Sequence, residues 1–251
     1  MPEDLHFYLF AIPAVVLIGL AKGGFSGLGA LGTPLMALGI EDPVRAAAIL
    51  LPILIAQDVV GVAAFRKSWD GSVLAAMLPG AVVGIVLGYL LAARISADAV
   101  MAVLGAITIL FGAYRLWIER GGRIAASSNS PAWVGSLFGV ATGFTSQIAH
   151  AGGPPFQMWV MPRKLARDVF VGTSAIFFAI INWIKVPAYV ALGQFTAENA
   201  IATAVLLPLA ILASLAGVKL VRRVSPERFY TIVYLLMIVA GAKLLVDGIA
   251  A

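Results

Sequence analysis

The sequence predicts an all-α integral membrane protein with about eight transmembrane helices and two short broken or re-entrant half-helices, built from two duplicated four-helix repeats. Three observations support this fold class. Apolar residues make up 61% of the 251 residues and charged residues only 12%, about half the usual charged share of a soluble domain. Long apolar runs recur along the whole chain. Gly- and Pro-rich segments interrupt these runs at two corresponding places.

Eight apolar runs are the expected membrane spans, because about 20 helical residues cross the roughly 30 Å hydrocarbon layer. They occupy residues 7–21, 46–65, 72–92, 97–118, 132–149, 169–192, 200–220 and 229–246. The first and fifth runs each lead into a Gly/Pro segment, followed by short apolar stretches that end at Ile40 and Met161. Since Gly and Pro start helices well and continue them badly, both stretches are expected to be half-helices.

The two halves of the chain resemble each other at a nearly constant spacing. Leu-Pro at 78–79, Gly88 and Arg-x-Ser at 94–96 recur 129 residues later, at 207–208, 217 and 223–225. The Gly/Pro segment of the first half recurs 119 or 120 residues later. We therefore expect a first transmembrane repeat at 1–121, a Gly-, Ser- and Asn-containing linker at 122–131 and a second repeat at 132–251, all within one membrane domain.

The Lys and Arg residues between the apolar runs predict an orientation, because cytoplasmic loops are richer in these residues. With both half-helices re-entrant, one face collects Arg45, Arg94, Arg163, Lys164, Arg167, Arg222, Arg223 and Arg228, and the other collects Arg66, Lys67, Arg120 and Arg123. The larger group predicts the cytoplasmic face, with both termini outside and the two halves parallel. If the short stretches cross the membrane fully, the repeats become inverted.

The Gly/Pro breaks of the two repeats predict a binding site where the halves meet. Half-helices that begin near Pro34 and Pro154 would present free N–H groups and positive dipole ends, which suit a small oxyanion. The expected substrate-binding residues are Lys22, Gly23, Gly24, Phe25, Ser26, Gly32, Thr33, Gly143, Thr145, Ser146, Gln147, Gly152 and Gly153. The alternative interpretation is that these small residues only pack helices together.

Ionisable residues within or near the apolar runs are a second group of candidates. Asp58, His150 and Lys185 are expected to carry protons or compensate charge, because ionisable groups in lipid normally face a cavity or a partner. Their helices occupy corresponding places in the repeats, so Gln57 and Asp58 are expected to meet Asn182 and Lys185. This contact predicts either a relay, with Gln57 and Asn182 as supporting polar groups, or a structural ion pair.

Other features of the sequence argue against several function classes. The chain has no Cys and two His, so neither a metal site nor a cofactor is expected. The GLGALG segment at 27–32 matches a dinucleotide fingerprint but follows a predicted transmembrane helix instead of a strand. The net charge of +5 does not predict nucleic-acid binding, since the basic residues lie between apolar runs. No catalytic motif is recognisable, so the chain is not expected to be an enzyme. Lys243 and Asp247 are expected to form a surface pair.

Several motifs together resemble the TauE/SafE sulfite exporter family, also called the toluenesulfonate uptake permease family. They are KGGFSGLG at 22–29, GFTS at 143–146 with GGPP at 152–155, LPG at 78–80, and NWIKVP at 182–187 with LG at 192–193. The resemblance covers essentially the whole chain. It implies about eight spans from a duplicated four-span unit, a sulfur-containing anion as substrate and a bacterial inner membrane as location. The QIAH run at 147–150 departs from a more Gly-rich run in relatives, which bears on which anion is bound.

The expected function is a secondary transporter that exports a small sulfur-containing anion, such as sulfite, a sulfonate or a related oxyanion, across the cytoplasmic membrane, with proton coupling as an option. An anion channel that uses the same helix ends is the alternative. The expected partners are the small anion and the lipid bilayer, without nucleic acid. The sequence leaves a homodimer open.

Overall fold

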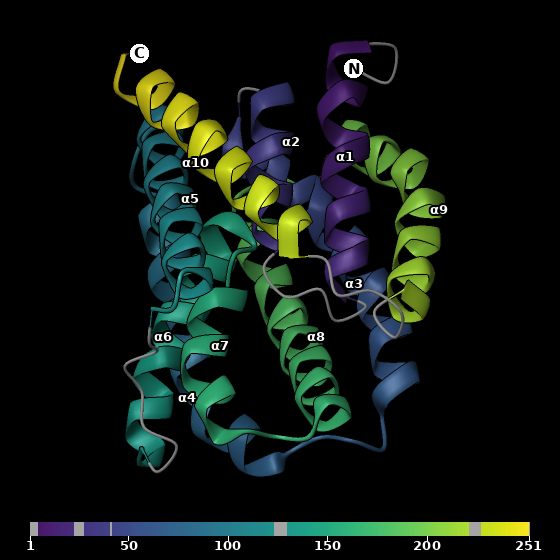
Figure 1. Cartoon of the computed structure of the whole chain (residues 1–251). Helices are drawn as coiled ribbons and strands as arrows, with labels where there is room; N and C mark the ends of the chain where they lie inside the picture. The colour runs from purple at the N-terminus through teal and green to yellow at the C-terminus, as the bar shows by residue number, and fades with distance from the viewer. Residues whose placement is uncertain (1–4, 23–27, 41, 123–129, 221–226, 251) are drawn as a thin grey trace.

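The fold is known from a computed structural model that describes residues 5–22, 28–40, 42–122, 130–220 and 227–250. All regular structure in these residues is helical (Figure 1). The elements are α1 (Leu5–Lys22), η1 (Leu28–Leu31), α2 (Gly32–Ile40), α3 (Pro43–Phe65), α4 (Gly71–Ala92), α5 (Ala97–Glu119), α6 (Ala132–Ala149), α7 (Gly153–Val160), η2 (Met161–Arg163), α8 (Arg167–Ala191), α9 (Ala197–Leu220) and α10 (Glu227–Ala250).

Six of the described helices, α1, α3, α4, α5, α8 and α9, are long and apolar enough to cross a membrane. The prediction of an all-α, multi-pass membrane protein is therefore confirmed. Helices α6 and α10 have 18 and 24 residues. The two short helices, α2 and α7, have 9 and 8 residues and follow the two breaks. At 1.5 Å per residue, neither short helix can cross the hydrocarbon layer alone.

Acidic and hydroxyl residues fix where three of the long helices begin. Asp42 accepts hydrogen bonds from the backbone N–H groups of Val44 and Arg45 at the start of α3. Asp70 caps α4 and Ser96 caps α5 by the same kind of bond. A side-chain acceptor at this position satisfies N–H groups that have no partner inside the helix.

Each break lies at the tip of a helical hairpin. Near the end of α2, Gly39 lies against Phe10, which is near the start of α1. On α7, Trp159 lies against Gly135, near the start of α6. Each short helix therefore runs back along the long helix before it. The chain returns toward the end of the molecule from which the hairpin began.

Two pairs of neighbouring helices, each with one helix from either half of the chain, run in opposite directions. Helices α3 and α8 are antiparallel, because Asp58 contacts Asn182 while Phe65 lies beside Gly172. Helices α5 and α10 are also antiparallel neighbours, and α4 packs in parallel along α6. In Figure 1, α1 descends from the end that carries the N-terminus, whereas α6 and α8 rise from the opposite end.

The helix directions change the grouping of the basic residues. Gly172 of α8 packs against Ser68 of the α3–α4 loop, so the α7–α8 loop lies at the same end as that loop. The sequence-based grouping, which separated these loops, is wrong here, because it did not foresee that the second hairpin, α6–α7, returns to its starting end. The residues now brought to one end are Arg66, Lys67, Arg163, Lys164 and Arg167. Arg123, Arg222 and Arg223 lie outside the described residues.

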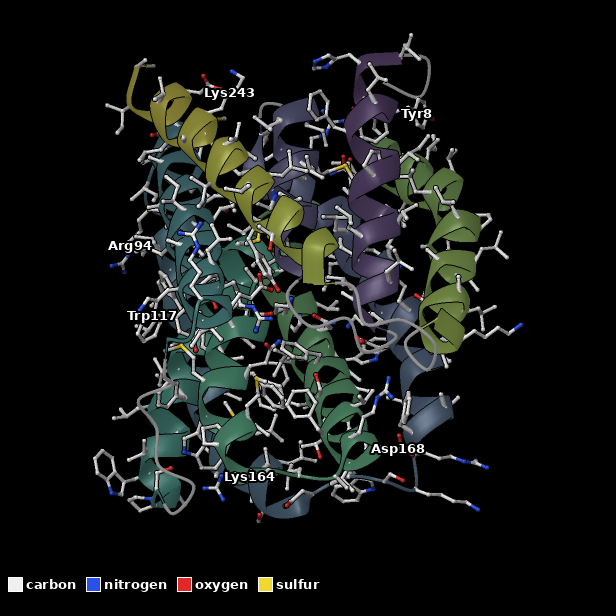
Figure 2. The ribbon with its side chains drawn as sticks, viewed as in Figure 1. Tyr8, Arg94, Trp117, Lys164, Asp168 and Lys243 are labelled. Carbon is white, nitrogen blue, oxygen red and sulfur yellow. The ribbon has the colours of Figure 1, made fainter. Side chains whose placement is uncertain are left out.

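The start of α1 and the end of α10 both lie at the opposite end of the molecule from these basic loops (Figure 1). Tyr8 and Lys243 lie there, whereas Lys164 and Asp168 lie at the basic end (Figure 2). Lys243 forms the expected ion pair with Asp247, with 2.7 Å between Nζ and Oδ2.

Candidate functional site

A cavity of about 120 Å³ lies between the tips of the two hairpins and the middle of the α3–α8 pair. Its polar lining residues are Lys22, Ser146, His150, Gln157, Ser174 and Asn182. Apolar side chains, including Ile18, Leu54 and Phe178, form much of the remaining wall. None of the described lining residues is Asp or Glu. The cavity therefore offers hydrogen-bond donors without a carboxylate at its surface.

Five of the residues predicted from the sequence line this cavity. They are Lys22, Ser146, His150, Gly153 and Asn182. Gly23, Gly24, Phe25 and Ser26 lie outside the described residues. The prediction missed Gln157, which lines the cavity and is 7% exposed. Its position one helical turn after Gly153 was the signal that could have found it.

The remaining predicted binding residues that the structure describes are not among the residues that line this cavity. They are Gly32, Thr33, Gly143, Thr145, Gln147 and Gly152. A Cβ atom on Gly143 would lie 2.0 Å from the carbonyl oxygen of Ala81 on α4. The hydroxyl of Thr145 donates to the carbonyl of Ala141 at 2.8 Å. For Gly143 and Thr145, this geometry is that of helix packing.

The carboxylate of Asp58 is held by two groups beside the cavity. Lys22, the last residue of α1, forms an ion pair with one of its oxygens. Asn182 donates from Nδ2 to the other oxygen at 2.6 Å. The ammonium group of Lys22 also lies 5.7 Å from the centre of the Phe178 ring. The expected contact between the α3 and α8 polar residues is thus present, and Lys22 joins it. Gln57 faces away and donates to the carbonyl of Ala210 on α9.

Lys185 has a different set of partners. It is fully buried, and its Nζ donates to the carbonyl and hydroxyl oxygens of Ser146 at 3.2 and 3.1 Å and to Nδ1 of His150 at 2.7 Å. The carbonyl oxygen of Ala47 lies 2.8 Å from His150 Nε2. Because a carbonyl only accepts, Nε2 carries the proton and Nδ1 is free to accept from Lys185. The three protons of an ammonium group thus meet three neutral acceptors.

The described partners of Lys185 include no carboxylate, so a protonated Lys185 would carry a positive charge that none of these partners compensates. Lys22 and Asp58 neutralise each other, whereas the described partners of Lys185 are neutral. A buried charge is costly unless a counter-charge compensates it. The cavity beside Ser146 and His150 is where a small anion would supply that charge.

The start of α7 also lies at the cavity, through Gly153 and Pro154. The positive end of the helix dipole favours an anion there. However, Pro154 and Pro155 have no N–H groups, so this helix start lacks two of the donors that such ends normally present. Side-chain donors therefore matter more in this part of the cavity than at an ordinary helix start.

A family model described as "Sulfite exporter TauE/SafE" matches residues 11–244. The chain belongs to the TauE/SafE family. The matched region contains every residue that lines the cavity. As a TauE/SafE protein, the chain is a multi-pass membrane transporter of the sulfite-exporter type, which implies a small anionic substrate. No curated protein and no solved structure matches the chain.

Proposed function

We propose that the chain is a secondary transporter that exports sulfite, or a similar sulfur oxyanion, across the cytoplasmic membrane through the cavity between the two hairpins. One observation carries the proposal. Lys185 is buried among neutral acceptors beside a cavity with donors and, in its described lining, no carboxylate. An anion in the cavity would compensate this charge, while a cation would add to it.

The lining also favours a particular class of anion. Four of the lining side chains carry N–H or O–H groups, namely Lys22, Ser146, Gln157 and Asn182. A ligand whose exposed atoms only accept hydrogen bonds, such as sulfite, fits this set. The ammonium group of a zwitterion such as taurine would find no carboxylate among the described lining residues, and its burial would be unfavourable.

Proton coupling would pass through Asp58. Protonation of this carboxylate would remove the charge that holds Lys22. Lys22 would then be free to bind the anion, so a proton and the anion would bind together. His150 and Lys185 would hold the second positive charge at the same site.

The arrangement of the helices supports alternating access. We propose that α3, α4, α5, α8, α9 and α10 cross the membrane, whereas the hairpins α1–α2 and α6–α7 enter it and return to the end from which each begins. The halves would be inverted repeats, because corresponding helices are antiparallel and the contacts of α1 with α9 match those of α6 with α4. The two hairpins enter from opposite ends, so relative motion of the halves would open the cavity to each side in turn.

The test is a thermal-shift titration of the detergent-purified protein with sulfite, sulfate, thiosulfate, taurine and a neutral sugar. Selective stabilisation by sulfite is expected, and a ligand at 100 times its Kd stabilises the fold by about 2.7 kcal/mol. Taurine and the sugar should give no shift. If no anion raises the unfolding temperature, the proposal is wrong. In liposomes, saturable flux distinguishes a carrier from a channel.

A further inference from the structure

We propose that Arg115 fixes the orientation of the Gln157 side-chain amide and thereby makes Gln157 a donor to the bound anion. The inference rests on the proposed function, since it requires an anion in the cavity. It assigns a positioning role to Arg115, which does not itself line the cavity.

Arg115 reaches from α5 to α7 and is held by a buried tyrosine of α10. Its Nη1 donates to Gln157 Oε1 at 3.1 Å. Its Nε and Nη2 donate to the hydroxyl of Tyr234 at 3.0 and 2.8 Å. The guanidinium carbon also lies 5.2 Å from the centre of the Tyr234 ring, and Tyr234 is fully buried. These contacts restrain the plane and position of the guanidinium group.

The chemistry of the two groups determines the direction of the amide. A guanidinium group has only N–H donors, whereas an amide has one acceptor oxygen and one NH2 group. Only Oε1 of Gln157 can face Arg115, so the NH2 group points away from it. Nε2 lies 3.6 Å from the position that a Cβ on Gly153 would occupy, at the part of the cavity where α7 begins.

An oriented amide fills a gap in the site. Pro154 and Pro155 remove backbone donors from the first turn of α7, and Gln157 supplies an N–H donor from the next turn. With the amide reversed, Oε1 would face the anion and repel it. Among the described residues Arg115 is in no salt bridge, so its attachment to Gln157 is not in competition with a carboxylate.

A double-mutant cycle on sulfite affinity, measured by calorimetry, tests this role. Arg115→Met should weaken sulfite binding about tenfold, as for the loss of one hydrogen bond to a charged group. Arg115→Lys, which keeps a donor for Oε1, should restore affinity to within about threefold of the parent. In a Gln157→Leu background, Arg115→Met should have no further effect. A full second loss in that background would show that Arg115 acts through its charge and would overturn the inference.

Gln157→Glu tests the same point without disturbing Arg115. The carboxylate would pair with the guanidinium group, so the folded protein should keep its unfolding temperature or gain stability. It would present no donor to the cavity, and sulfite binding should be lost. Retained binding in this variant contradicts the inference. If the parent protein binds no anion, the proposed function fails as well; if the parent binds and Arg115→Met binds equally, only the role of Arg115 fails.

Discussion

At the scale of single residues, the cavity depends on how a few buried polar groups are paired. Asp58 is 3% exposed and is satisfied by Lys22 and Asn182. Lys185 is as deeply buried but is surrounded by neutral acceptors. The two amines therefore differ in their partners: Lys22 is paired with a carboxylate of the chain, whereas we propose that Lys185 is compensated by a bound anion.

Replacing Lys185 tests that difference. Lys185→Met should lower sulfite affinity tenfold or more, because a compensated buried charge is worth at least about 1.4 kcal/mol. The unfolding temperature without ligand should change little, since an apolar chain of similar volume replaces an unpaired charge. Titration calorimetry and thermal unfolding measure the two effects. The exposed Lys243→Met is the matched control and should leave both unchanged. Equal sulfite affinity in Lys185→Met and the parent would refute the assignment.

Replacing Asp58 separates binding from proton movement. Asp58→Asn removes the titrating group but keeps a side chain that can bond Asn182 and leaves Lys22 free. Sulfite affinity should be retained and should no longer depend on proton uptake. Liposomes that report internal pH during sulfite flux provide the measurement. Proton movement that still accompanies sulfite in this variant would remove Asp58 from the relay.

At the scale of the elements, the helix boundaries were the most predictable feature of the chain. The run expected at 72–92 is α4, Gly71–Ala92, and that expected at 97–118 is α5, Ala97–Glu119. Lipid imposes this agreement, because a spanning helix needs about 20 apolar residues and polar caps at its ends. The direction of the short helices was harder to predict. A stretch of nine apolar residues has the same composition whether the chain turns back along the preceding helix or continues across the membrane.

The cap of α4 provides a pH-dependent test at this scale. The hydroxyl of Ser72, the backbone N–H groups of Ser72 and Val73 and the charge of Arg163 together lower the pKa of Asp70, against the effect of its partial burial. A folded-state pKa below the unfolded value of about 3.9 gives stability that is present above that pH and is lost as the pH falls through the folded pKa. Asp70→Ala should cost about 1 kcal/mol at neutral pH.

Asp70→Asn is the control, because it keeps an acceptor for the helix but does not titrate. Its unfolding temperature should stay near that of the parent at neutral pH and should lack the parent's additional loss below about pH 4. Thermal unfolding between neutral and acidic pH measures both variants. The same acid-induced loss in Asp70→Asn as in the parent would show that other carboxylates cause it.

The candidate site was predictable in part, for reasons that lie in particular residues. Asp58 and Asn182 were paired from the sequence because buried polar residues in lipid need partners. Glycines and hydroxyl groups serve equally in helix packing and in anion binding. The sequence alone therefore could not decide between these two roles for Gly143 and Thr145. Arg115 was missed, since its contact with Gln157 joins α5 to α7 and no local sequence pattern indicates it.

At the scale of the whole molecule, the two returning hairpins bring basic loops to one end, and these loops predict the orientation in the membrane. The loops that contain Lys67 and Lys164 lie at one end, and Lys243 lies at the other. By the positive-inside rule, we expect the basic end to face the cytoplasm. Both ends of the chain would then be external.

Cysteine labelling checks this orientation, and the chain has no native Cys to interfere. In intact cells, an impermeant maleimide should modify Lys243→Cys but not Lys67→Cys. After the membrane is permeabilised, both variants should react. The reverse pattern would place the basic loops outside and reject the orientation.

The packing of α1 along α9 has a consequence for biosynthesis. Helix α1 ends at Lys22 and is made first, whereas α9 begins only at Ala197. At roughly 5–20 residues per second, about nine to thirty-five seconds separate the two. During that time α9 is not yet available to pack against the Gly19 face of α1, which in the folded protein lies against Ala213. Asp58 is only 36 positions beyond Lys22. We therefore expect their ion pair to form early and to hold α1 against α3 until α9 has been synthesised.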